Sequence, residues 1–263
     1  MLNTSIGIGI RSGGISNSRG WITQLVNRYD TAPSSDLRAI IQHGGELLKN
    51  AGLIDALDFF YCLKLHTKQA CQQNWIQDRF NLLEVGGVVT FAQYTGCGAP
   101  SVSVCFNSGL NPMTSSDLKM SLNDVCIGGR NIGTGANQWL MGSYDGSNTL
   151  GIGMTSGFYG NNGTILSRNA NYPALVVGQR DGAASVKYYE EGVVTTSSDS
   201  NDSVALPNKD LYIIGHNNNG SVFRPMESPR YGSWLFGGKS LTPAKHQALH
   251  NIITELDLLI NSL

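Results

Sequence analysis

The chain has 263 residues and a formal net charge of −1, and charged residues make up 14% of it, well below the usual share of about 25%. It also holds 32 glycines, nearly twice the average share for this length. Low charge and many glycines favour an all-β protein with many tight turns. They argue against a helical enzyme and against a disordered tail.

Charge and hydropathy also argue against two classes of partner. Lysine and arginine form no cluster longer than a pair, so the basic surface expected of a nucleic-acid binder is missing. No segment approaches the roughly 18 consecutive apolar residues of a membrane span, and the first residues lack the basic and apolar regions of a signal peptide. We therefore expect a soluble protein that contacts neither nucleic acid nor membrane and carries no secretion signal of its own.

The cysteines are odd in number and include no C-x-x-C pair; they are Cys62, Cys71, Cys97, Cys105 and Cys126. This pattern predicts reduced, mostly buried thiols in a protein made in a reducing cytoplasm. A Cys97–Cys105 bridge stays open as an alternative if the two residues lie on adjacent strands.

Residues 1–32 show no stable hydrophobic period, so we predict an extended arm there. Residues 33–74 form a predicted helical segment. Its first helix is capped by Ser34 or Ser35 and carries an apolar stripe, and its second follows Gly52. The two stripes consist of Leu37, Ile40, Ile41 and Leu48, and of Leu53, Ala56, Leu57, Phe60 and Tyr61.

Residues 75–263 have the sequence pattern of short strands separated by turns. Strands are predicted at 85–92, 102–106, 138–144, 150–155, 164–168, 174–180, 184–190 and 192–196. The clearest hairpin signal is the Asp181–Gly182 link, which a two-residue type I′ turn requires. Another turn signal is the run 217–220. Strands at this spacing predict a sandwich or a barrel.

The last part of the chain predicts two strands, 210–216 and 231–237, followed by an amphipathic helix. Thr242 can cap this helix and Pro243 fits its first turn. Its apolar stripe consists of Leu249, Ile252, Ile253, Leu256 and Leu259. Such a stripe needs a partner, so we predict a helical strap packed on the β-sandwich, with Ile213 and Trp234 in the core.

The segments LYIIGHNN (211–218) and YGSWLFGGKSLTPAKHQALHNIITEL (231–256) resemble the ending of concanavalin A-like (laminin G-like) jelly-roll domains. The resemblance implies a mainly β fold, an antiparallel β-sandwich over residues 75–263. The N-terminal arm and short helices would precede this sandwich, and the amphipathic helix would close it. The fold alone does not fix a function, because it carries lectins, hydrolases and adhesion modules alike.

Residues 53–98 are similar to the segment before this jelly roll in bacteriophage and prophage structural proteins, through Asn74–Trp75 and Thr90–Phe91. The chain departs from that pattern at Gly96–Cys97–Gly98 and in its Gly44–Gly45 helix. The resemblance implies a non-enzymatic virion protein, such as a head-decoration, fibre or tail component. It would be made in the bacterial host cytoplasm and form a homo-oligomer. The resemblance does not cover residues 1–50, but their arm is rich in Gly, Ser and Asn and has few apolar residues of its own to bury, so we expect it to dock on other virion proteins.

A carbohydrate-binding module for attachment to a host-surface glycan is the first alternative. Such a site pairs an aromatic ring with neighbouring Asn and Asp groups, because sugars stack on rings and hydrogen-bond to amides. The candidate aromatic residues are Trp139, Tyr144, Tyr159 and Tyr172.

A glycoside hydrolase is the second alternative, and the acidic residues argue against it. Concanavalin-like hydrolases place three carboxylates on alternate positions of one strand, and no E-x-D-x-E run occurs here. Glu190 and Glu191 are adjacent and would point to opposite faces of a strand, so they cannot act as a pair. Mutation of Glu190, Glu191 or Glu227 would test this alternative.

Two features could hold a metal ion. Asp145 with Asn148, and Asp199 with Asp202, form loops rich in the oxygen ligands that calcium prefers, although both are also ordinary turn sequences. His246 and His250 have the i, i+4 spacing of a zinc pair but lack a third ligand nearby, so we predict a solvated helix face for them. No cofactor other than a structural calcium is expected.

Overall fold

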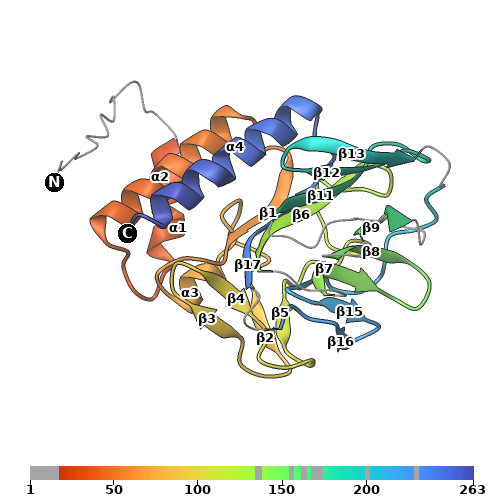
Figure 1. Cartoon of the computed structure of the whole chain (residues 1–263), viewed down its shortest axis with the longest axis horizontal. Helices are drawn as coiled ribbons and strands as arrows, with labels where there is room; N and C mark the ends of the chain where they lie inside the picture. The colour runs from red at the N-terminus through yellow and green to blue at the C-terminus, as the bar shows by residue number, and fades with distance from the viewer. Residues whose placement is uncertain are drawn as a thin grey trace.

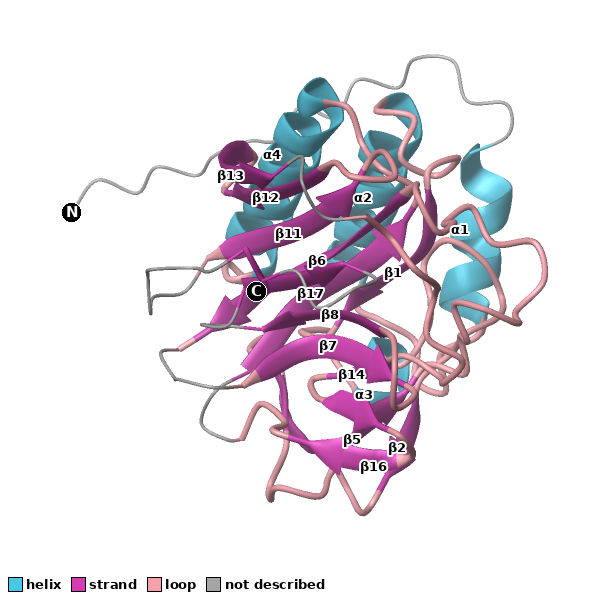
Figure 2. Ribbon diagram, turned by 90° about the vertical axis from the view of Figure 1, so that its right-hand side faces the viewer, coloured by secondary structure: helices cyan, strands magenta, loops and turns pink. Residues whose placement is uncertain are grey.

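The computed structural model describes residues 18–133, 138–153, 157–160, 165–166, 174–198, 202–227 and 231–263. The described strands form two β-sheets that pack face to face, and helices α1 (Ser18–Asn27), α2 (Ser35–Asn50) and α4 (Pro243–Ile260) form a further layer on the outside of one sheet (Figures 1 and 2). The predicted β-sandwich with a C-terminal helix is therefore confirmed. Among the described residues, no helix combines the length and apolar composition needed to span a lipid bilayer.

The first sheet, sheet A, has eight strands in the order β13-β12-β11-β6-β17-β4-β3, with β1 alongside β17. All its pairings are antiparallel. The strands are β1 (Leu57–Cys62), β3 (Thr90–Ala92), β4 (Gly96–Gly98), β6 (Val125–Ile132), β11 (Leu175–Arg180), β12 (Val186–Glu190), β13 (Val193–Ser198) and β17 (Tyr231–Gly238).

The second sheet, sheet B, has nine strands in the order β10-β9-β8-β7-β14-β5-β2, with β15 beside β7 and β16 beside β15. Only the β15–β7 pairing is parallel among the described strands. The strands are β2 (Leu83–Val85), β5 (Cys105–Asn107), β7 (Trp139–Tyr144), β8 (Thr149–Gly153), β9 (Gly157–Gly160), β10 (Ile165–Leu166), β14 (Tyr212–Ile213), β15 (His216–Asn218) and β16 (Ser221–Phe223).

The core lies between the two sheets. Phe158 of β9 lies so close to Gly178 of β11 that a Cβ at Gly178 would come within 2.0 Å of the ring. Ile213 and Trp234 are fully buried, as predicted. The contact between Phe158 and Gly178 shows that the Phe158 face of sheet B points towards sheet A and that the opposite face points away from it.

The helix layer consists of α1 (Ser18–Asn27), α2 (Ser35–Asn50) and α4 (Pro243–Ile260); α3 (Lys68–Cys71) is a single turn elsewhere. The hydroxyls of Ser34 and Thr242 accept from the N–H groups of Leu37 and Lys245, so both predicted caps are confirmed. Leu256 of α4 packs against Gly44 of α2, where a Cβ would lie 3.0 Å from the leucine side chain. The predicted strap therefore packs on its own chain.

The carboxylate of Asp257 also connects the C-terminal helix to sheet A. Asp257 accepts from Lys64 Nζ at 2.9 Å, from Trp234 Nε1 at 2.7 Å and from Arg130 at 3.0 Å. The Lys64 side chain is only 2% exposed. A buried cation needs such a partner, because an uncompensated charge in the interior is strongly unfavourable.

Two predictions for the N-terminal part are wrong. Residues 18–27 form helix α1 and not an extended arm, while residues 1–17 lie outside the described part. The predicted second helix is strand β1, which pairs with β17 over Leu57–Gly238 to Cys62–Trp234, so sheet A includes residues before position 75. All six residues of β1 are buried, and such a strand shows a continuous apolar run that also fits a helical stripe.

The predicted two-residue turn at Asp181–Gly182 is also wrong. Arg180 pairs with Val186, so the β11–β12 loop has residues 181–185. Asp181 accepts from Ser185 Oγ at 2.7 Å and pairs with Lys187, which stabilises this longer loop. The two-residue hairpin lies instead between β15 and β16, where Asn219 and Gly220 have φ of 51° and 98°.

The five cysteines are free and buried, which confirms the predicted reduced thiols. Burial raises the pKa of Cys105 to about 12. A thiol with such a pKa is a poor nucleophile, because the thiolate is the reactive form.

Candidate functional site

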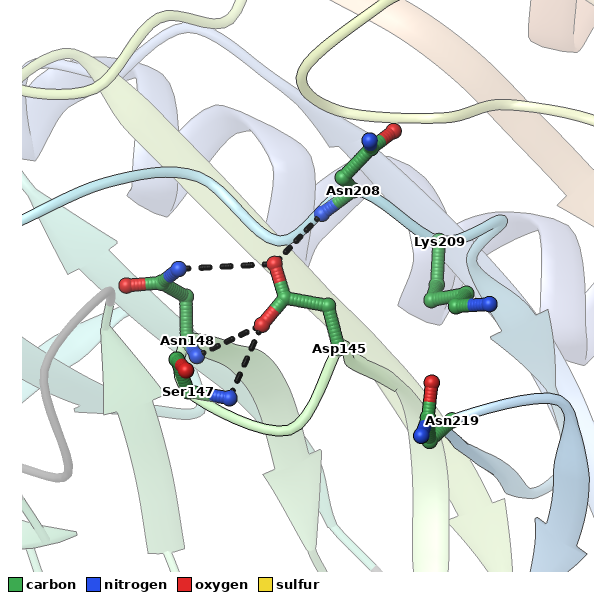
Figure 3. Close-up of a pocket in the computed structure, with 6 residues that line it drawn as sticks. All are labelled: Asp145, Ser147, Asn148, Asn208, Lys209 and Asn219. Carbon is green, nitrogen blue, oxygen red and sulfur yellow. Dashed lines mark hydrogen bonds between the residues drawn. The ribbon is translucent and has the colours of Figure 1, made fainter.

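A polar hollow of about 430 Å³ lies at the end of β7 (Figure 3). Strand β7 belongs to sheet B, the sheet farther from the helix layer (Figure 1). Three segments meet at the hollow: the β7–β8 turn, the segment before β14, and the end of β15. The lining residues are Asp145, Ser147, Asn148, Asn208, Lys209 and Asn219. We call this site the Asp145 hollow.

Asp145 connects two of the three segments that form the hollow. Its Oδ1 accepts from the N–H groups of Ser147 at 3.0 Å and Asn148 at 2.8 Å, and its Oδ2 accepts from the N–H of Asn208 at 2.9 Å (Figure 3). Burial alone would raise the pKa of Asp145, but these N–H donors, with the Asn148 side chain, outweigh it and lower the pKa to about 2. Asp145 is therefore an anion that ties the β7–β8 turn to the segment before β14.

The side chains of Ser147, Lys209 and Asn219 have no hydrogen-bond partner among the described residues. Figure 3 shows the Lys209 ammonium pointing away from Asp145. The hollow thus offers a hydroxyl, an ammonium and an amide on a backbone that Asp145 fixes. Tyr144 lies next to it: its hydroxyl donates to Gly146 O at 2.7 Å, and its carbonyl accepts from Asn219 N at 2.8 Å.

Farther along β7, four rings form a cluster that we call the aromatic row: Trp139, Tyr159, His216 and Phe223. The ring centroids of Trp139 and His216 are 4.3 Å apart, those of Trp139 and Tyr159 are 5.0 Å apart, and those of His216 and Phe223 are 6.3 Å apart. The row therefore connects β7, β9, β15 and β16.

Two glycines allow these rings to lie directly on the backbone. Gly142 and Gly151 face each other across β7 and β8, and Tyr159 is opposite Gly151 on β9. A Cβ at Gly142 would lie 2.1 Å from His216, and one at Gly151 would lie 2.7 Å from Trp139. Because the neighbouring position Phe158 points at sheet A, the row lies on the outer face of sheet B.

The members of the aromatic row differ in exposure. Trp139 is 6% exposed and His216 is 4% exposed, whereas Phe223 is 37% exposed. Tyr159 is partly exposed. Trp139 and His216 are thus the buried members of the row, and Tyr159 and Phe223 are its solvent-accessible members.

His216 and His246 are buried histidines with low pKa values. Burial lowers the pKa of each to about 4, and both nitrogens of His216 lack a described partner. His246 stacks on Tyr189 with ring centroids 3.6 Å apart, and its Nε2 lies 2.8 Å from Gln179 Oε1. The predicted solvated helix face is therefore wrong for His246, which is 1% exposed.

We expect these two histidines to make the fold acid-sensitive. Their pKa of about 4 in the fold lies below the value of about 6.5 in an unfolded chain. The unfolded chain therefore binds more protons between these values, and stability falls as the pH drops from about 6.5 towards 4. The expected loss between pH 7 and pH 4.5 is up to about 2.5 kcal/mol for each histidine, and urea unfolding at these two pH values measures it.

The variant His216→Phe provides the control, because it removes a titrating ring that has no hydrogen bond to any described residue. Its stability should fall less between pH 7 and pH 4.5 than that of the unmodified chain. An unchanged pH dependence would show that His216 is not buried as described.

The structure brings several predicted site residues together and separates others. Trp139 contacts Tyr159, while Tyr144 borders the hollow that contains Asp145 and Asn148. Asp202 is exposed, and Tyr172 and Asp199 lie outside the described residues. Sequence reasoning missed Asn208, Lys209, Asn219, His216 and Phe223; the Asn-rich run at 217–219 was a signal that could have indicated part of this set.

Calcium at Asp145 stays a prediction, and the structure defines what it would require. Both carboxylate oxygens already accept N–H groups, so a calcium ion would have to displace these bonds or bind beside them. No cluster of three or more His, Cys, Asp or Glu residues suited to a metal occurs in the described ranges.

Of the three carboxylates named for the hydrolase alternative, Glu191 makes structural contacts. Glu191 accepts from the N–H of Leu175 at 2.9 Å and pairs with Arg130 at 3.1 Å and with His250 at 2.9 Å. Glu190 ends β12 of sheet A. Neither residue lines the Asp145 hollow.

Comparison with known proteins identifies a fold but no family. No family model matches the chain, and no curated protein sequence matches it. Among solved structures, it is similar to domain 4 of AbnA, a GH43 extracellular arabinanase from Geobacillus stearothermophilus, in complex with arabinotriose. That match has a TM-score of 0.50 and 13% identity, and covers 74% of this chain and 98% of that one.

The chain is also similar to a mutant of Trypanosoma rangeli sialidase displaying trans-sialidase activity. The TM-score is 0.53 with 9% identity over 83% of this chain, which spans only 39% of the sialidase chain. At these identities the two likenesses establish a β-sandwich fold.

Proposed function

We propose that this chain is a carbohydrate-binding β-sandwich that holds a glycan on the outer face of sheet B. The main support for this proposal is the Asp145 hollow. There the Ser147 hydroxyl, the Lys209 ammonium and the Asn219 amide, which have no partner among the described residues, lie beside Tyr144 on a backbone that Asp145 fixes. Glycans present many hydroxyl groups and apolar C–H faces, so they need polar side chains next to an aromatic ring. The aromatic row lies on the same sheet, farther along β7, and would offer rings to a longer glycan.

The likeness to an arabinanase domain solved with arabinotriose supports a saccharide ligand for a sandwich of this shape. The binding groups proposed here come from this chain alone: Ser147, Lys209, Asn219 and Tyr144 at the hollow. Phe223 and Tyr159 would contact further sugar units.

We propose binding without hydrolysis. Hydrolysis of a glycosidic bond uses two carboxyl groups, one of which donates a proton. Asp145 is the one acidic residue that lines the hollow in the described chain, and its pKa of about 2 leaves it ionised at neutral pH. It can accept hydrogen bonds from sugar hydroxyls, but it cannot act as the general acid.

The virion role stays a prediction from the sequence resemblance over residues 53–98. Docking through residues 1–50, a homo-oligomer and a virion location belong to that prediction. Glycan binding is compatible with it, since a virion protein that binds a host-surface glycan would carry both roles.

A glycan array that includes bacterial surface polysaccharides and arabinans tests the proposal. We expect selective binding, and the variants Lys209→Ala and Asn219→Gly should each weaken it roughly 10-fold, as expected for one lost hydrogen bond to a charged or desolvated group. Glycine is chosen at position 219 because the φ of 51° there strains most other residues.

The matched control is Asn251→Ala, an exposed asparagine on α4 in the helix layer. Its affinity should equal that of the unmodified chain. Silence across the array, or equal binding by all three variants, would contradict the proposal.

A further inference from the structure

A second hollow, of about 370 Å³, lies between α1 and the loop after Asn74. Trp21 and Trp75 contribute two indole rings to its wall, and Gln24, Asn27 and Gln77 contribute amides. Its α1 wall belongs to the helix layer, whereas the Asp145 hollow lies at the end of β7 of sheet B; Figures 1 and 2 show α1 and β7 in different layers. We call this second hollow the Trp21 hollow.

The charges that line the Trp21 hollow neutralise each other. One Arg28 nitrogen lies 2.6 Å from Asp78 Oδ1, and the other terminal nitrogen donates to Asn74 O at 2.8 Å. The hydrogen bond from Arg28, with one from Asn81, lowers the pKa of Asp78, which therefore stays ionised and paired. The site therefore suits a neutral ligand better than an acidic or basic one.

Two residues that line the hollow also carry unpaired donors. Trp75 Nε1 and Arg28 Nε are buried and have no hydrogen-bond partner among the described residues, and the Trp75 side chain is only 1% exposed. Buried donors are normally satisfied, so this pair leaves unused hydrogen-bonding capacity in the wall of the hollow. At the rim, Gln24 and Asn27 are exposed and offer amides in addition.

We infer that the Trp21 hollow is a second saccharide site, for an uncharged sugar ring. The inference extends the proposed function, on whose glycan chemistry it rests. Ring and hydroxyl oxygens of a neutral sugar can accept from the exposed amides of Gln24 and Asn27, and the apolar sugar face packs on the partly exposed Trp21 ring. Two sites on different sides of one chain would allow it to cross-link polysaccharide strands and gain avidity.

Tryptophan fluorescence tests the inference, because Trp21 is the partly exposed one among four tryptophans. Trp75, Trp139 and Trp234 are 1%, 6% and 0% exposed. Iodide quenching of the full chain therefore reports mainly on Trp21. The probes are neutral hexasaccharides of glucose, xylose and arabinose, each titrated at millimolar concentration. We expect at least one of them to lower the quenching constant about twofold.

The variant Lys209→Ala separates this site from the Asp145 hollow. It should keep the protection of Trp21, whereas the double variant Gln24→Ala with Asn27→Ala should lose it, and both substituted residues are exposed, so the fold is retained. Calorimetry should give two sites in the unmodified chain and one in the double variant. Absence of protection by every probe, or two sites in the double variant, overturns the inference. A glycan that binds the chain without protecting Trp21 would overturn the second site but would still support glycan binding at the Asp145 hollow.

Discussion

Replacing Asp257 with alanine is expected to lower the free energy of unfolding by about 3–5 kcal/mol, the cost of breaking a buried ion pair from one side. Among the described residues, the variant leaves Lys64, which is 2% exposed, with the Asn261 amide oxygen at 2.8 Å as its remaining partner. It also removes the acceptor of the Trp234 indole and one partner of Arg130. Urea unfolding at neutral pH measures the loss.

The matched control is Glu255→Ala on the same helix. Glu255 pairs with His43 at 2.7 Å, but the two side chains are 50% and 41% exposed. Exposed ion pairs contribute little, so this variant should change stability by less than about 1 kcal/mol. Equal losses in the two variants would show that Asp257 does not anchor α4.

Replacing Asn74 with alanine is expected to lower stability by a similar amount, about 3–5 kcal/mol, because several buried backbone groups lose their partners at once. Its Oδ1 accepts from the N–H groups of Phe60 at 3.1 Å and Ile76 at 3.0 Å. Its Nδ2 donates to the carbonyls of Asp58 at 3.1 Å and Arg79 at 3.0 Å. Asn74 thus holds the loop 74–81 against β1.

The control is Asn50→Ala, since Asn50 is exposed at the end of α2. Its stability should stay within about 0.5 kcal/mol of the unmodified chain. A small effect at Asn74 would show that water replaces the side chain. The Asn74–Trp75 pair, noticed in the sequence as a resemblance, has a structural role here.

Local chemistry made part of the fold predictable. The caps at Ser34 and Thr242 depend on a hydroxyl and an N–H within three residues, so short sequence windows contain the whole signal. Strand β1 was not predictable in this way. Its helical-looking stripe arises because both faces are buried, and only pairing with β17, some 175 positions later, reveals it as a strand.

The candidate site was predictable only in pieces. Asp145 and Asn148 form a local turn that the sequence indicates, but Asn208, Lys209 and Asn219 reach the hollow through the fold of sheet B. The aromatic row depends on Gly142 and Gly151, whose missing side chains give the rings of His216 and Trp139 their space. No spacing rule connects such residues before the sheet is built.

The most direct measurement of the central claim is a nuclear magnetic resonance titration of the full chain with a glycan selected from the array. The account predicts that backbone amide shifts concentrate at the β7–β8 turn around Ser147, at Asn208–Lys209 and at Asn219, with weaker shifts near Phe223. Shifts absent from these segments, and confined to residues around Trp21 or elsewhere, would contradict glycan binding on the outer face of sheet B.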